Sequence, residues 1–104
     1  MSHQELIETR DVVPAQTIDM HRAIQALIGE LQALDANNQR IEACTDPELR
    51  LLLAHQRDTG RRQLAMLLEW MRRRDARLDK DMKELMFKAG PIVAQYHYKE
   101  ERDE

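Results

Sequence analysis

A single helix-start signal, Thr45-Asp46-Pro47-Glu48, lies between the two longest stretches of helical periodicity in this sequence. We expect Thr45 to cap the amide of Glu48 while the Glu48 side chain bonds back to Thr45. Pro47 falls in the first helical turn, where a missing amide hydrogen costs nothing. The helix that begins here is expected to run for about 30 residues, through Arg72-Arg73-Arg74, because neither a proline nor a cap interrupts it.

The segment before this signal predicts an earlier amphipathic helix of about 24 residues. It is expected to start near residues 14–18, after Pro14, and to end in Asn37-Asn38-Gln39, whose side chains compete locally for backbone hydrogen bonds. Its apolar stripe consists of Met20, Ile24, Leu27, Leu31 and Leu34. Because the connection at residues 40–44 is short, the two helices should pack antiparallel as a hairpin.

A two-helix hairpin cannot enclose a core, since each helix exposes an apolar stripe wider than one partner covers. Burying one leucine stabilises a fold by about 1.5–3 kcal/mol. Leaving Ile24, Ile28, Leu52 or Met71 exposed would therefore forfeit much of a small domain's stability. The sequence predicts an all-α homo-oligomer, in its simplest form two hairpins that pair into a four-helix bundle.

The second helix has a polar gap in the middle of its apolar stripe. Leu49, Leu53, Leu67 and Trp70 follow the spacing of a helix interface, and the same spacing places Gln56, Gly60 and Gln63 between them. Facing helices of a bundle build metal and cofactor sites at such positions, but carboxamides and glycine are poor metal ligands. The expected interface residues are Leu31, Leu34, Gln56, Gly60, Gln63, Leu67 and Trp70.

Three further segments complete the predicted organisation. Residues 1–13 are expected to form a flexible arm, and residues 14–92 the helical body. A shorter third helix over residues 78–87 ends before Gly90-Pro91. Residues 93–104 form a tail that we expect to be disordered at its charged end.

Composition limits the class of protein. The chain has 104 residues, a net charge of −3 and one cysteine, Cys44, so no internal disulfide forms and nucleic-acid binding is disfavoured. No apolar run approaches the ~18 residues of a membrane span, and the amino terminus lacks the pattern of a signal peptide. We therefore expect a cytoplasmic protein without a membrane or nucleic-acid partner.

The sequence resembles the encapsulated ferritins, small ferritin-like proteins that bacteria package inside encapsulin shells. The resemblance spans roughly residues 18–92 and rests on His21-Arg22-Ala23-Ile24, Glu30-Leu31, Leu34-Asp35, Gln39-Arg40, Thr45-Asp46-Pro47-Glu48-Leu49, Leu53-Ala54-His55, Arg57-Asp58, Ala65-Met66, Leu68-Glu69-Trp70, Arg72-Arg73, Asp75-Ala76 and Gly90-Pro91-Ile92. It implies a hairpin that pairs into a four-helix bundle, with dimers that assemble further into a decameric ring. It also implies a di-iron ferroxidase centre at the dimer interface.

In that family each hairpin supplies a Glu from the first helix and a Glu-x-x-His motif from the second. Glu30 matches the first-helix ligand, but the motif positions are occupied by Gly60 and Gln63. Of the family's outer iron-entry ligands, His55 matches. The family's shell-targeting peptide has no counterpart in residues 99–104, which leaves an encapsulin lumen open as a location without a signal for it.

Several interpretations of these residues remain open. Glu30 is either a metal ligand or a carboxylate that is solvated or paired with Arg61 or Arg62. His55 and Asp58 share a helix face as a weak metal pair or as ordinary surface groups. Gly60 allows either close packing of a partner helix or a small cavity, and Gln56 and Gln63 can bond to their symmetry mates and fix the register.

Two functions follow. The favoured one is an encapsulated-ferritin-like oligomer with a degenerate di-iron site, no ferroxidase activity and a role in assembly or partner binding, for which no cofactor is expected. The partner is a second copy of the chain, an encapsulin shell or an intact ferritin-like protein. The alternative is a ferroxidase or iron-storage protein that binds iron with a reduced set: Glu30, His55 and Asp58.

Overall fold

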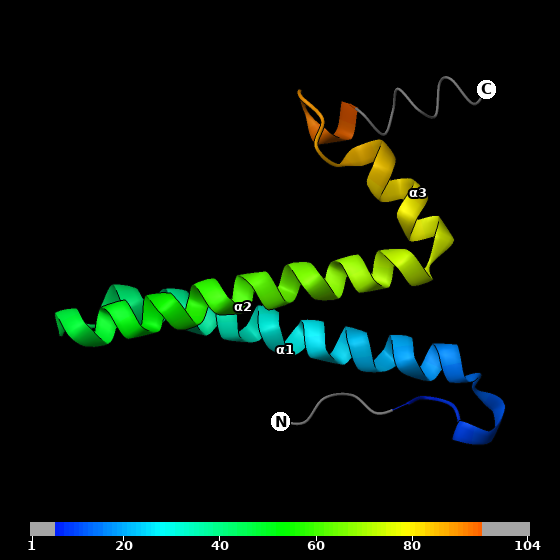
Figure 1. Ribbon diagram of the computed structural model, residues 1–104, viewed down its shortest axis with the longest axis horizontal. Coiled ribbons are helices and arrows are strands. Elements are labelled where there is room, and N and C mark those ends of the chain that lie inside the picture. The colour runs from blue at the N-terminus through cyan, green and yellow to red at the C-terminus, as the bar shows by residue number, and fades with distance from the viewer. Residues whose placement is uncertain (1–5, 95–104) are drawn as a thin grey trace. The chain divides into compact units, whose positions relative to one another are not determined.

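A computed structural model describes residues 6–94 of the chain, all of whose longer elements are α-helices (Figure 1). After a short 3-10 helix, η1 (Arg10–Val12), come α1 (Ala15–Ala43), α2 (Pro47–Arg74) and α3 (Ala76–Leu85). The described residues form two compact units, divided between Trp70 and Met71. The predicted all-α class is confirmed, and the expected tail from residue 95 onward lies outside the described residues.

α1 and α2 form the predicted antiparallel hairpin, joined by three residues (Figure 1). α1 begins at Ala15, where the amides of Thr17 and Ile18 donate to the carbonyl oxygen of Pro14 at 3.0 and 3.1 Å. It runs for 29 residues to Ala43, so the predicted end in Asn37-Asn38-Gln39 is wrong. Asn37 and Ile41 are buried in the hairpin, and this packing outweighs the weak helix propensity of the Asn-Asn-Gln segment.

The residue that caps α2 lies one position after the predicted one. Asp46, not Thr45, is the capping residue: its Oδ2 accepts the amide of Leu49 at 2.8 Å. Pro47 is the first helical residue, as expected. Asp46 immediately precedes this proline, and its negative charge also interacts favourably with the positive end of the helix dipole.

The second unit contains α3, which lies two residues earlier than predicted. Asp75 caps it by accepting the amides of Arg77 and Leu78 at 3.1 and 3.0 Å. The side chain of Asp79 pairs with Arg72 and, at 3.1 Å, with Lys83. α3 ends at Leu85, and Phe87 follows in the left-handed conformation (φ 62°) with a side chain that is 98% exposed.

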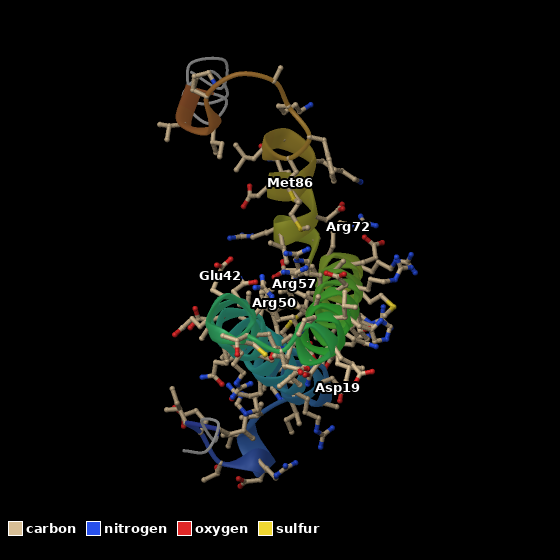
Figure 2. The ribbon with its side chains drawn as sticks, turned by 90° about the vertical axis from the view of Figure 1, so that its left-hand side faces the viewer. Asp19, Glu42, Arg50, Arg57, Arg72 and Met86 are labelled. Carbon is tan, nitrogen blue, oxygen red and sulfur yellow. The ribbon has the colours of Figure 1, made fainter. Side chains whose placement is uncertain are left out.

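The hairpin has almost no core of its own. Of the apolar side chains in residues 6–94, only Ala23 and Ile41 are buried, at 8% and 9% exposure. No residue of α2 is fully buried, and in the end-on view charged side chains extend outward around both helices (Figure 2). Large apolar side chains stay exposed on both helices, among them Ile24, Leu31, Leu49, Leu51, Leu52 and Met66. Of the apolar residues that the sequence pattern assigns to an interface, the single chain leaves Leu31 exposed, whereas Leu34, Leu67 and Trp70 are partly covered.

Candidate functional site

The candidate site is a groove between the middle turns of α1 and α2. Its volume is about 410 Å³. The groove is lined by Glu30, Ala33, Leu34, Asn37, His55, Gln56, Arg57, Thr59, Gly60 and Gln63. Six positions that the sequence singled out therefore line the groove: Glu30, Leu34, His55, Gln56, Gly60 and Gln63.

Glu30 and Gly60 are in direct register across the hairpin. A Cβ atom built on Gly60 would lie 3.3 Å from Oε2 of Glu30, which is tighter than an ordinary contact. The half-buried Glu30 carboxylate thus fills the space that a side chain at position 60 would enter. This contact within one chain is a third explanation for the glycine, beside the two that the sequence suggested.

The Glu30 carboxylate has no hydrogen bond or salt bridge to any group in residues 6–94. Arg61, one of its two predicted partners, instead bonds through Nη1 to Oδ1 of Asp58 at 3.5 Å. Arg62 lies two residues beyond Gly60, which at about 3.6 residues per turn is on the opposite side of α2. Within the single chain, neither arginine neutralises Glu30.

The structure separates the two residues that were expected to share a helix face. His55 lines the groove. The carboxylate of Asp58 is not part of the groove lining, and it pairs with Arg57 at 3.2 Å as well as with Arg61. His55 and Glu30 are therefore the metal-binding side-chain types that one chain brings into this groove.

Asn37 is a groove residue that the sequence analysis missed. It is 2% exposed, the most buried polar residue described, and its Oδ1 accepts a hydrogen bond of 3.4 Å from Nη1 of Arg40. Its spacing from Glu30 could have predicted this place, because a residue seven positions later lies two turns along the same face of α1. This hydrogen bond lies within α1 and satisfies the buried oxygen of Asn37 at this end of the groove.

One chain brings few iron-binding side chains to this groove. Iron in such sites is held by several carboxylates together with imidazole, whereas this groove contains one carboxylate, one imidazole, carboxamides and a hydroxyl per chain. Throughout residues 6–94, no three His, Cys, Asp or Glu side chains are grouped so as to hold a metal ion.

The described helices also include none that is long and apolar enough to cross a membrane.

Comparison with known proteins places the chain in a family. The crystal structure of protein ne0167 from Nitrosomonas europaea matches with a TM-score of 0.81 and 46% identity, covering 86% of this chain and 98% of that one. An encapsulated ferritin-like protein of Rhodospirillum rubrum is 44% identical over 87 residues, which is 84% of this chain and 62% of that protein. A ferritin-like protein of Thermotoga maritima is 35% identical over 75 residues, which is 72% of this chain and 66% of that protein.

The chain spans less than two thirds of the length of both curated relatives. The model of the EncFtn-like family matches residues 5–89, a range that includes the whole hairpin, the groove and α3. The resemblance that the sequence motifs indicated is thereby confirmed, and the chain belongs to the encapsulated-ferritin-like (EncFtn-like) family.

Proposed function

We propose that this protein is a non-catalytic member of its family, an oligomeric helical protein that acts in assembly or partner binding without a di-iron centre. The observation that carries the proposal is the Glu30–Gly60 contact. At the position of the second-helix carboxylate the chain has only a hydrogen atom, and the carboxylate of Glu30 has settled 3.3 Å from where a Cβ would be.

The chemistry of the neighbouring groups supports the same conclusion. Oxidising two ferrous ions needs carboxylates that bridge them and imidazoles that complete their coordination. Gln63 presents a neutral amide at the imidazole position, and amide oxygens bind iron weakly. Asp58, which could have substituted, is already paired with Arg57 and Arg61.

The exposed apolar side chains support a role in assembly. Leu52 is 62% exposed and Met66 is 57% exposed on α2, on either side of the groove residues. Large apolar side chains that are exposed this much, next to one groove, are typical of an interface that another chain covers. The covering chain is a second copy, an intact ferritin-like protein or the shell that the name of the Rhodospirillum relative implies for that protein.

A ferrous iron titration tests the proposal against its alternative, iron oxidation by Glu30 with His55. Metal-free protein is loaded anaerobically and exposed to air while ferric absorbance is followed, and native mass spectrometry records the oligomer. We expect oxidation no faster than in buffer and a stable metal-free oligomer. Oxidation several-fold faster than buffer, lost in Glu30→Ala, would establish the alternative.

The double variant Gly60→Glu with Gln63→His is the matched positive control, because it restores the missing ligand types on the same backbone. The Cβ atom that Gly60→Glu adds requires the end of the Glu30 side chain to move by only a few tenths of an ångström. Rapid oxidation by this variant, together with none by the natural sequence, would localise the loss of activity to these two positions.

A further inference from the structure

We infer that the groove is one half of a symmetric interface in which Gln63 of a second copy of this chain donates a hydrogen bond to the Glu30 carboxylate, and the reverse. The inference rests on the proposed metal-free assembly and names its partner and its central contact. An amide–carboxylate pair would then connect the two subunits at the place where the family resemblance predicts metal ligands.

The first observation is an unmatched acceptor. An ionised carboxylate only accepts hydrogen bonds, and one that is removed from water without a donor is costly. The Glu30 carboxylate is half-buried against Gly60 already in the single chain, and residues 6–94 supply it with no donor. Covering the groove with another apolar surface would bury this charge unpaired, so the covering surface must bring a donor.

The second observation is that the matching donor lies on the same chain. Gln63 lines the groove, is exposed and makes no side-chain hydrogen bond within the described part of the chain. Its carboxamide has two N–H donors. Hydrogen bonds to a charged partner are about twice as strong as those between neutral groups. An N–H group of Gln63 is therefore a suitable donor for the Glu30 carboxylate.

The third observation identifies the partner as a second copy. Leu52, Gln56, Thr59, Gln63, Met66 and Trp70 form a stripe with alternating spacings of four and three residues, the pattern with which one helix packs on another. The stripe is apolar at both ends and polar in the middle. Its spacing is symmetric about residue 61, so a twofold axis there sets Leu52 against Trp70, Gln56 against Met66 and Thr59 against Gln63. The first and the last of these pairs match in polarity.

This axis also fixes the level of the contacts along the helix. With two α2 helices antiparallel about residue 61, Leu52 faces Trp70 of the other copy and Gln63 faces Thr59. Thr59 is one residue, an axial rise of about 1.5 Å, from Gly60, against which Glu30 packs. Gln63 of the second copy therefore arrives at the level of the Glu30 carboxylate.

The test is a double-mutant cycle on the full chain in EDTA, with dimer dissociation constants measured by sedimentation equilibrium. We expect a stable metal-free dimer, and we expect Glu30→Ala and Gln63→Ala each to weaken it about a hundredfold, because two equivalent bonds are lost per dimer. The double variant should be no weaker than the weaker single variant, since both remove the same contact. Gln32→Ala, an exposed glutamine of α1 outside the groove lining, is the matched control and should leave the constant unchanged.

Circular dichroism checks that each variant is helical, and Glu30→Met, which keeps the length of the side chain but cannot accept the hydrogen bond of the Gln63 amide, replaces Glu30→Ala if that variant does not fold. Single effects that multiply in the double variant, or a Gln63→Ala dimer as tight as that of Gln32→Ala, would overturn the pairing while a metal-free dimer leaves the proposed function standing. A chain that is monomeric in EDTA and dimerises only with iron would overturn both. Rapid iron oxidation by a dimer with the expected coupling would overturn the proposed function alone.

Discussion

Replacing Gly60 by alanine measures how closely Glu30 packs on α2. A glycine in a helix interior is less favourable than alanine by about 1 kcal/mol, so the substitution gains this amount unless the methyl group is obstructed. The new Cβ would lie 3.3 Å from Oε2 of Glu30, which must then shift by a few tenths of an ångström. A small side-chain displacement costs up to about 0.5 kcal/mol, so we expect a net gain of about 0.5 kcal/mol.

Gly29→Ala is the matched control, because Gly29 is also inside a long helix, α1. It should gain the full ~1 kcal/mol. For a small domain this corresponds to a rise of about 4–8 °C in Tm, and Gly60→Ala should give roughly half as much. Thermal unfolding followed by circular dichroism in EDTA, at one fixed protein concentration, measures both.

The Glu30→Ala background removes the obstructing carboxylate, so the two glycine substitutions should there become equal in effect. The reasoning is refuted if Gly60→Ala equals Gly29→Ala while Glu30 is present. It is equally refuted if Gly60→Ala lowers Tm by several degrees, because backbone from another chain would then occupy the space above Gly60.

Three further outcomes are expected. Asp46→Ala should lower the free energy of unfolding in urea by about 1 kcal/mol, since the cap of α2 is lost, whereas Thr45→Ala should change it by less than about 0.5 kcal/mol. The pKa of Asp79 lies below its ordinary 3.8 because Lys83, and then Arg72, bond to the ionised carboxylate, so its contribution is complete above pH 3.8 and is lost as the pH falls through the lowered value. When helix content is followed as the pH is lowered below 3.8, the loss should therefore be smaller in Asp79→Asn than in the natural sequence. Phe87→Gly should raise stability by about 1 kcal/mol in thermal unfolding, because the left-handed backbone is relieved while an exposed ring is removed.

Local signals predicted the beginnings of the long helices better than the end of the first. Pro14 and Pro47 restrict the backbone whatever surrounds them, so both helix starts follow from the sequence. The end of α1 depends on tertiary packing, because Asn37 is a poor helix former that the hairpin buries. The exact cap of α2 was also undetermined, since Thr45 and Asp46 are both good capping residues and only the structure shows which one bonds to the helix.

The groove was predicted by position but not by contact. Heptad spacing placed Gln56, Gly60 and Gln63 on one face, and all three line the groove. Spacing within one helix cannot show what the facing helix supplies, so the packing of Glu30 on Gly60 was not foreseen. Nor could it reveal that Asp58 would pair with two arginines, because rotamers of exposed charged side chains are decided by their neighbours in space.

The scarcity of buried apolar side chains in the hairpin also affects how much of the protein accumulates. Two buried aliphatic residues, Ala23 and Ile41, contribute little against the conformational entropy of two helices of 29 and 28 residues. We therefore expect a newly made chain without a partner to open often and to be cleaved easily by proteases. Association removes chains from this vulnerable pool, so the steady-state level should rise more steeply than synthesis does. Chains made in excess of their partner should be degraded rather than stored.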